Sequence, residues 1–351
     1  MIMNIKLRFQ RLWTDDEAKT GDVLPRMLLR MLSLSYGGAV LLRNILYDRR
    51  FIRQKRLPCP VISVGNITVG GTGKTPTVIR IADLLKQHGY RPAVLSRGYG
   101  GKSGGPVNVV SDGKTVLMGW KEAGDEPVLM ANSLPGIPVL TGAVRFLTGR
   151  AAVERLGADI LILDDAFQHR QLFRDLDLVL LDSTRPFGNG FLLPRGPLRE
   201  GLHALLRADM LLRTGVAEKG EPLPVKTKFN VHKTEFNVYN IELPSFRGVH
   251  KPTGIVSGRT GHSDSPEALR GQKIMAFSGI GSPEAFRQGL AALGADVVSY
   301  RDFPDHHPYS DADIVALRRL AAGSGASLLV TTERTGSGLP ISLIFWQKFR
   351  F

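Results

Sequence analysis

Short apolar runs alternate with longer amphipathic stretches along most of this chain. The first pair is the β-rich run Cys59–Val64 and the helical stretch Thr75–His88, which stops at Gly89. A second helix is predicted over Ala151–Leu156. Further short runs predict strands at Ala93–Ser96, Pro138–Thr141, Ile160–Leu163, Leu176–Leu181 and Met210–Leu212. Strands that alternate with helices in this way predict a mostly parallel sheet covered on both faces.

The alternation weakens between about Ala217 and Leu269, where only Glu235–Leu243 has the pattern of a strand. We expect the connection between two domains there. A second α/β unit resumes at the strand Lys273–Ser278, and Ser282 and Pro283 are the predicted N-cap and first residue of a helix. The remaining predicted strands of this unit are Val297–Tyr300 and Ser327–Thr331.

The N-terminal part has a different pattern. Met31–Leu42 carries no charge and is bracketed by Arg30 and Arg43, and basic residues follow it up to Arg56. A membrane-spanning helix needs roughly 20 apolar residues, so this stretch is too short to cross a bilayer. Two interpretations stay open: a helix lying in the plane of a membrane surface, with cations placed for lipid headgroups, or a soluble helix packed on its own domain.

Composition narrows the class of protein. The chain has 351 residues, a formal net charge of +14 and a single cysteine, Cys59, so an intramolecular disulfide is impossible. A basic protein attracts anions, whether nucleic acid, anionic lipid or phosphorylated ligands. We find no zinc-finger spacing, no aromatic RNA-binding motif and no basic-zipper pattern, and we therefore expect no nucleic acid partner.

A glycine-rich loop lies between the first predicted strand and helix. It runs from Gly65 through Gly70, Gly71, Thr72, Gly73, Lys74 and Thr75. Glycines let backbone N–H groups converge on phosphate oxygens, Lys74 can reach the β- and γ-phosphates, and the Thr75 hydroxyl can bind Mg²⁺. The usual phosphate-loop spacing would place glycine at Thr68, so the loop departs from the general pattern there. The sequence predicts an ATP and Mg²⁺ site with a P-loop NTPase-like fold.

An acidic pair follows a buried strand about 90 residues later. Ile160–Leu163 ends in Asp164 and Asp165. Carboxylates at the carboxyl end of such a strand, near a phosphate loop, hold Mg²⁺ in phosphoryl-transfer enzymes. An aspartate that caps a helix is the alternative interpretation.

Seven blocks in order make the chain similar to the tetraacyldisaccharide 4'-kinase (lipid A 4'-kinase) family, over roughly residues 25–335. The glycine-rich loop is the first block, and the family's loop also carries its glycines late. The other blocks are Ser96–Gly100, Gly124–Pro127, Asp164–Arg170, Pro194–Glu200, Phe303–His307 with Tyr309, and Thr331–Glu333. The tail departs from the family at Arg334-Thr335-Gly336, which leaves the last strand in doubt.

The resemblance implies a function. The family transfers the γ-phosphate of ATP to the 4'-hydroxyl of tetraacyldisaccharide 1-phosphate in lipid A biosynthesis, on the cytoplasmic face of the inner membrane of Gram-negative bacteria. We accordingly expect a peripheral, monotopic membrane enzyme with a lipid disaccharide substrate and no obligate protein partner. The expected fold is a P-loop core at 58–230, a connection at 231–270, a smaller α/β domain at 271–351 and an N-terminal amphipathic membrane-associated segment at 1–57.

The resemblance also implies residue roles. Asp125 is the expected base for the acceptor hydroxyl, His306 is its expected partner, and Lys74 steadies the phosphates. The expected Mg²⁺ ligands are Thr75, Asp165, Glu200 and Asp164. Weaker candidates for substrate contact are Arg97, Tyr99, His169 and Arg199. Because Asp125 and His306 lie in different predicted domains, we expect domain closure to bring them together.

Two other functions compete with this one. A partner-gated P-loop ATPase or GTPase, such as a maturation or targeting factor, would share the phosphate loop and the acidic strand end. A GTPase would also carry an Asn-Lys-x-Asp base-reading motif, which we do not find. A non-enzymatic membrane or nucleic-acid binder would leave the phosphate loop unexplained.

Overall fold

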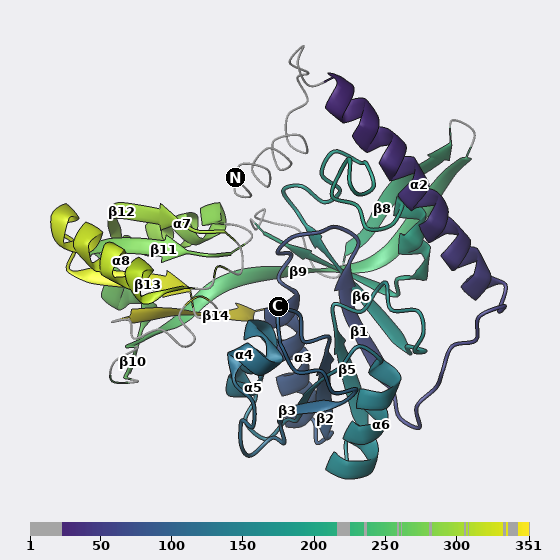
Figure 1. Cartoon of the computed structure of the whole chain (residues 1–351), viewed down its shortest axis with the longest axis horizontal. Coiled ribbons are helices and arrows are strands. Elements are labelled where there is room, and N and C mark those ends of the chain that lie inside the picture. Colours follow the sequence, from purple (N-terminus) through teal and green to yellow (C-terminus); the bar gives the residue numbers. More distant parts are fainter. Residues whose placement is uncertain are drawn as a thin grey trace.

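The computed structural model describes residues 23–215, 225–234, 237–257, 260, 262–280, 283–304, 307, 309–332, 335 and 343–350. Its strands join into one sheet of 14 strands, in the order β12-β11-β13-β14-β9-β7-β6-β1-β5-β2-β4-β3, with β8 and β10 also paired to β9. Most neighbours are parallel, which confirms the predicted mixed α/β fold (Figure 1).

The first half of the sheet contains the glycine-rich loop. Its strands are β1 (Val61–Asn66), β2 (Pro92–Ser96), β3 (Asn108–Ser111), β4 (Val139–Thr141), β5 (Ile160–Asp164), β6 (Leu176–Asp182) and β7 (Met210–Thr214). All of these pair in parallel except β3, which is antiparallel to β4. The predicted strands are all present, and β3 is an additional strand at the outer edge.

Helices cover both faces of this half because alternate residues of each buried strand point to opposite faces. On one face Val64 and Ile162 pack against α3 (Lys74–Gln87) and α5 (Asp125–Ser133). On the other, Leu161 and Leu163 pack against α6 (Arg145–Leu156). A short helix, α4 (Trp120–Ala123), precedes α5, and a 3₁₀ helix, η2 (Leu202–Arg207), precedes β7.

A pair of long strands stands where the sequence predicted a mostly irregular connection. β8 (Val225–Thr234) and β9 (Asn237–Val256) form an antiparallel hairpin. β9 then pairs in parallel with β7 and, further along, antiparallel with β14 (Leu343–Arg350). One strand therefore connects the two halves of the sheet, as Figure 1 shows. Strand β14 also means that the atypical tail ends in a strand of the sheet.

The second half repeats the strand-and-helix plan on a smaller scale. Its strands are β11 (Lys273–Ser278), β12 (Asp296–Asp302) and β13 (Leu328–Thr332), with the short β10 (Ser263–Asp264) paired to β9. Helix α7 (Pro283–Ala292) covers one face and α8 (Asp311–Ser324) the other, and η3 (Pro266–Leu269) precedes β11. The predicted N-cap residue Ser282 lies outside the described residues, and the exact domain limits stay a prediction.

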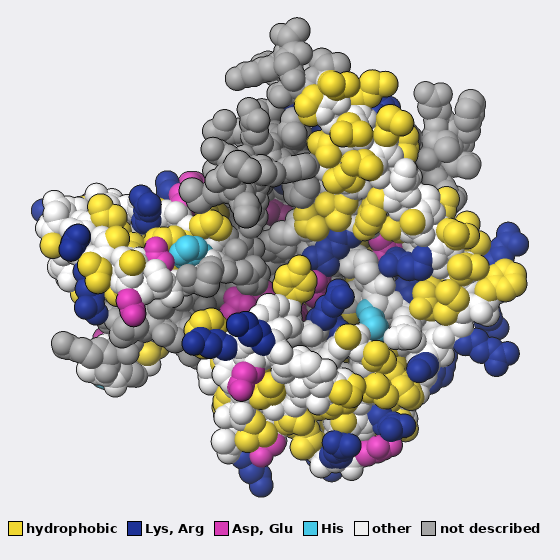
Figure 2. All heavy atoms as spheres, viewed as in Figure 1, with side chains coloured by type: hydrophobic (Ala, Val, Ile, Leu, Met, Phe, Trp, Pro, Cys, Tyr) yellow, Lys and Arg dark blue, Asp and Glu magenta, His cyan; other side chains and the backbone are white. Residues whose placement is uncertain are grey.

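Helix α2 (Val23–Asp48) lies along one side of the first half (Figure 1). Its outward residues are apolar and exposed: Leu24, Met27, Leu28, Met31, Leu32, Leu34, Leu41, Leu42 and Ile45. Figure 2 shows apolar side chains of this region as a yellow patch at the top of the molecule. Among the described helices, none has both the length and the apolar character needed to cross a bilayer.

Candidate active site

The glycine-rich loop connects the buried end of β1 to the first turn of α3. Gly70 and Gly73 have φ angles of 120° and 83°, in the region that favours glycine. A Cβ built on Gly70 or on Gly71 would meet no atom within 4 Å, so this part of the backbone faces open space. The α3 N-terminus directs its unpaired N–H groups toward the same place, which suits an anionic ligand.

The loop is held on its inner side. Asn66 donates from Nδ2 to Thr72 Oγ1 at 3.0 Å, and the Thr214 hydroxyl donates to the Thr72 carbonyl at 3.0 Å. Thr214 ends β7, two strands away from β1 in the sheet. The loop therefore has a fixed inner side and an open outer side, as a preformed phosphate cradle requires.

The acidic pair lies directly beside this loop because β5 is the parallel neighbour of β1. Asp164 ends β5, and Asp165 follows with a φ of 49°, which is rare for a non-glycine residue. Lys74 Nζ lies 3.6 Å from Asp165 Oδ1, and Arg199 Nη1 donates to both oxygens of Asp165 at 3.0 and 2.9 Å. Backbone strain of this kind persists where surrounding contacts hold it, and it concentrates at functional sites.

The two carboxyl groups differ in their electrostatics. Burial raises the pKa of Asp164, and the nearby carboxylates of Glu126 and Asp165 raise it further. Its Oδ2 accepts a hydrogen bond from the Ser96 hydroxyl at 3.0 Å. Burial would also raise the pKa of Asp165, but Lys74 and Arg199 outweigh this effect and lower it. Asp165 is thus the ionised, half-exposed member of the pair.

Asp125 is the first residue of α5, after Gly124, whose φ is 92°. A Cβ on Gly124 would lie 2.4 Å from the Tyr99 carbonyl oxygen, so α5 begins against the loop that follows β2. The neighbouring residue Glu126 acts electrostatically on Asp164. Asp125, Tyr99 and the acidic pair, which come from motifs far apart in the chain, are therefore brought to one edge of the sheet.

Cations gather behind the acidic pair. Burial lowers the pKa of His169 to about 4, and the positive charges of Arg145, Arg174 and Arg97 lower it further. Arg145 is itself buried at the start of α6, where burial lowers its pKa to about 10 although Asp164 opposes the shift. Sequence reasoning did not identify Arg145, because an arginine in a helical stretch is usually a solvated residue. Tyr99 is well exposed at the mouth of this group.

Glu200 has different contacts from the other predicted Mg²⁺ ligands. It is fully buried, and its oxygens are held by Arg43, Asn44 and Arg207. Thr75 is the second residue of α3 and follows Lys74 directly. In the part of the chain that the structure describes, no three His, Cys, Asp or Glu side chains form a metal-binding cluster. Mg²⁺ sites in phosphoryl-transfer enzymes are compatible with this, because one or two protein groups, phosphate oxygens and water complete them.

The second half of the sheet contains an aromatic cluster formed by Phe277, Phe303, His307 and Tyr309. Phe303 stacks on His307 with ring centroids 4.8 Å apart, and Phe277 lies edge-on to Tyr309 at 5.7 Å. His307 Nε2 also lies 3.3 Å from Asp313 Oδ2. The predicted partner of Asp125, His306, lies outside the described residues.

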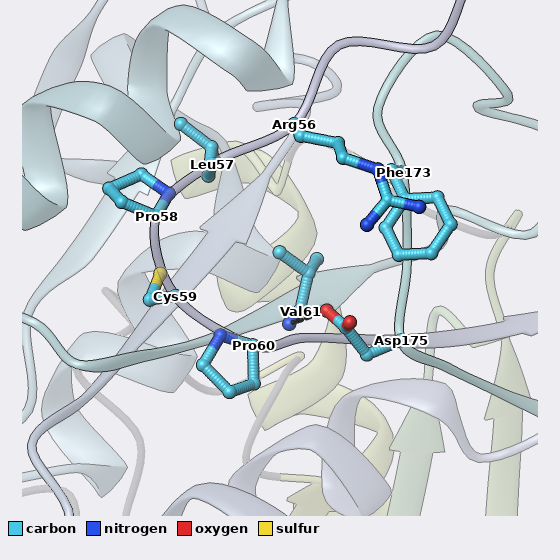
Figure 3. Close-up of a pocket in the computed structure, with 8 residues that line it drawn as sticks. All are labelled: Arg56, Leu57, Pro58, Cys59, Pro60, Val61, Phe173 and Asp175. Atoms are coloured by element: carbon cyan, nitrogen blue, oxygen red, sulfur yellow. Dashed lines mark hydrogen bonds between the residues drawn. The ribbon is translucent and has the colours of Figure 1, made fainter.

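A separate pocket lies at the opposite end of β1 (Figure 3). Its volume is about 290 Å³, and its lining includes Arg56, Cys59, Phe173 and Asp175. Asp175 Oδ2 accepts a hydrogen bond from Val61 N at 2.8 Å, which fixes the start of the strand. The phosphate loop follows the other end of the same strand, so this pocket is not part of the candidate active site.

Comparisons with known proteins find relatives over most of this chain. The family model described as Tetraacyldisaccharide-1-P 4'-kinase matches residues 25–335. A protein named tetraacyldisaccharide 4'-kinase from Syntrophus aciditrophicus is 53% identical over 336 residues, covering 95% of this chain and 89% of the relative. One of the same name from Pelobacter propionicus is 43% identical over 331 residues, covering 92% and 87%.

A solved structure gives the same picture in three dimensions. The crystal structure of LpxK from Aquifex aeolicus in complex with ATP matches this chain with a TM-score of 0.71 and 33% identity. The match covers 93% of this chain and 94% of the other. The similarity therefore extends through both halves of the sheet.

Proposed function

The chain belongs to the tetraacyldisaccharide-1-P 4'-kinase family, and from this premise we propose that the phosphate loop, the acidic end of β5 and the start of α5 form its phosphoryl-transfer site. The protein is an ATP-dependent tetraacyldisaccharide 4'-kinase, which phosphorylates the 4'-hydroxyl of tetraacyldisaccharide 1-phosphate in lipid A biosynthesis. The observation that carries the site assignment is the contact of Lys74 and Arg199 with Asp165 beside an open glycine loop. The gated ATPase or GTPase alternative is not favoured.

Nucleotide phosphates are bound by the loop itself. The backbone N–H groups of Gly70–Thr75 surround the phosphate oxygens, and the open space over Gly70 and Gly71 leaves room for them. Lys74, now 3.6 Å from Asp165, neutralises the transferring phosphate. The backbone of Lys74 lies in the first turn of α3, so its side chain needs little movement to reach the phosphate.

Thr75 and Asp165 fit a Mg²⁺ site at the end of β5, with Asp164 behind them. Their donors are hydroxyl and carboxylate oxygens, which Mg²⁺ prefers, and Asp165 is the more readily ionised of the two aspartates. When bound, Mg²⁺ would neutralise charge on the transferred phosphate. Asp165 keeps an exposed side toward the loop, whereas Glu200 is fully buried among its partners Arg43, Asn44 and Arg207, so we assign Glu200 a positioning role instead.

Asp125 is the proposed base. It lies at the α5 N-terminus, where it can accept the proton of the 4'-hydroxyl as the oxygen attacks the γ-phosphorus. His306 is proposed to orient this carboxylate from the second half of the chain, after the two halves close. Arg97, Tyr99, His169 and Arg199 remain candidates for contact with the substrate, to which we add the buried Arg145.

The outward face of α2 supports a membrane surface as the second partner. Its exposed side chains include Leu24, Leu28 and Leu34, while Arg49, Arg50 and Arg53 follow directly. An apolar face flanked by cations suits an anionic bilayer surface. We propose a peripheral position on the cytoplasmic face of the inner membrane, where the acylated substrate would reach the site laterally.

The test is transfer of label from γ-labelled ATP to detergent-dispersed tetraacyldisaccharide 1-phosphate with Mg²⁺. Wild type should label the lipid, and Lys74→Ala and Asp125→Ala should each lose about 10²-fold or more in kcat. Lys86→Ala and Asp83→Asn on the exposed side of α3 are the matched controls. Phosphate release without lipid labelling would instead support an ATPase, and full activity of Asp125→Ala would remove Asp125 as the base.

A further inference from the structure

Helix α2 meets the rest of the protein through directed polar contacts as well as through the buried side chain of Leu29. Ser33 donates from Oγ to the Leu192 carbonyl at 2.9 Å, and Tyr36 donates from its hydroxyl to the Arg199 carbonyl at 2.9 Å. Asn44, 3% exposed, donates from Nδ2 to Glu200 Oε2 at 2.8 Å. A helix that only anchored the protein would need none of these directed contacts. Two of the three reach Arg199 and Glu200, and Leu192 is joined to the same segment by a β-bridge with Leu198.

Glu200 is the centre of this contact. Its side chain is fully buried, and Arg43 of α2 lies 3.2 Å from Oε1 while Arg207 of η2 donates to both oxygens at 3.1 and 3.0 Å. A buried carboxylate must be paired and hydrogen-bonded to remain ionised. Two of its three partners, Arg43 and Asn44, come from α2, so α2 supplies much of the environment that keeps Glu200 in place.

The opposite side of the same segment holds the phosphate loop. Arg199 N donates to the Ile67 carbonyl at 2.7 Å, Val69 N donates to the Pro197 carbonyl at 2.8 Å, and Thr68 and Leu198 form a β-bridge. The Arg199 side chain also donates two hydrogen bonds to Asp165. Residues 197–200 are therefore held by α2 on one side and by the phosphate loop and Asp165 on the other.

A second route leads from Glu200 to the end of β1. The Arg207 guanidinium, fixed by Glu200, lies 4.7 Å from the centre of the Phe167 ring. Phe167 is fully buried and touches Gly65 so closely that a Cβ there would lie 2.6 Å from the Phe167 Cβ. A shift of Glu200 would therefore reach the phosphate loop through packing as well as through hydrogen bonds.

We propose that α2 is a positioning element of the phosphoryl-transfer site, with Tyr36 and Asn44 as positioning residues that align Arg199, Asp165 and the phosphate loop through residues 197–200. The inference rests on the proposed function of that loop. The helix that carries the exposed apolar face is therefore also the helix that sets the geometry of the phosphate site. Misplacing a reacting group by about 1 Å costs on the order of 10²-fold in rate.

The experiment measures nucleotide affinity and turnover separately. Affinity is measured with a fluorescent ATP analogue and Mg²⁺ without lipid, and kcat and KM with detergent-dispersed tetraacyldisaccharide 1-phosphate. Asn44→Leu and Tyr36→Phe should weaken nucleotide binding and lower kcat by about 10-fold to 100-fold, with the lipid KM unchanged. Matched controls are Asn108→Leu on β3 and Tyr300→Phe on β12, which change the same chemical groups elsewhere and should leave both quantities at wild-type values.

A paired substitution separates positioning from loss of folding. Asn44→Asp and Glu200→Gln should each be impaired, because each leaves the buried charges mismatched. Combined in one chain they exchange the carboxylate and the amide, and nucleotide affinity and kcat should recover together. Wild-type affinity and kcat in both Asn44→Leu and Tyr36→Phe, or no recovery in the exchanged pair, would overturn the proposal. Failure of the proposed function is distinct, since wild type itself would then not label the lipid.

Discussion

The two halves of the sheet follow one plan but end their strands in different ways. In the first half, β1 and β5 end in a glycine loop and an acidic pair: the loop backbone at Gly70 and Gly71 faces open space, and Asp165 beside it is partly exposed. In the second half, β11 and β13 end in contacts among themselves: Thr331 donates to the Phe277 carbonyl, and Thr335 accepts from Gly279 N. The comparison teaches that the fold alone does not make a phosphate site, since the loops at the strand ends decide it.

The same large-to-small substitution in each half sharpens this comparison most. Phe167 and Phe277 are both fully buried, so Phe167→Ala and Phe277→Ala should each cost about 3–5 kcal/mol of folding stability. Only Phe167 supports the phosphate loop, through Gly65 and Arg207. We expect Phe167→Ala to weaken ATP binding as well, while folded Phe277→Ala keeps wild-type ATP affinity.

Calorimetric unfolding and binding of a fluorescent ATP analogue, both measured well below the unfolding transition, check this pair. Equal loss of ATP affinity in the two variants would show that the halves do not act separately in nucleotide binding.

Adjacent histidines in the second half give the next largest expected effect. His306→Ala should lower kcat by roughly 10²-fold if it orients Asp125 across the two halves. His307→Ala should instead lower stability with little change in kcat, because His307 stacks on Phe303 and contacts Asp313. Steady-state kinetics and thermal unfolding of both variants separate the roles. Equal kcat values in His306→Ala and wild type would confine the chemistry to the first half.

Sequence reasoning found those parts of the molecule that local pattern determines. The strands β1, β5 and β11 are continuous apolar runs, and the glycine loop and the acidic pair follow from residues adjacent in the chain. Their juxtaposition was predictable because parallel strands end at one edge of a sheet. The first part of β9 was predicted as the strand Glu235–Leu243. Its continuation was not, since Pro244, Pro252 and several polar residues interrupt the strand pattern, and its pairing with β7 and β14 comes from tertiary contacts.

Side-chain contacts that depend on how distant elements pack could not be predicted from the sequence. Glu200 reads as a ligand next to Arg199, yet its partner Asn44 is 156 positions away, and only the packing of α2 brings them together. An arginine in a helix is usually solvated, but Arg145 is 3% exposed because α6 turns that side toward the end of β5. The roles of His306 and of domain closure stay predictions, as do the exact domain limits.

The prediction with the smallest expected effect concerns the charge of Asp313, which contacts His307 of the aromatic cluster in the second half. Asp313 Oδ2 accepts hydrogen bonds from Ser310 N and Ser310 Oγ at 2.9 and 2.7 Å and lies 3.3 Å from His307 Nε2, as part of a capping box at the start of α8. The backbone hydrogen bond from Ser310 contributes most to lowering the pKa of Asp313 below its ordinary value. The ionised carboxylate therefore stabilises the folded state above the unfolded pKa of about 3.9, and this contribution is lost as pH falls through the lower folded pKa.

Asp313→Asn should consequently cost about 0.5–2 kcal/mol of folding stability at neutral pH. Once the pH falls below the lowered folded pKa of Asp313, the difference from wild type should shrink toward zero, because the protonated acid resembles the amide. Denaturant unfolding of both proteins at pH 7 and at acid pH measures it, and Asp311→Asn in the same turn of α8 is the matched control. An equal difference at both pH values would mean that shape rather than charge holds this turn.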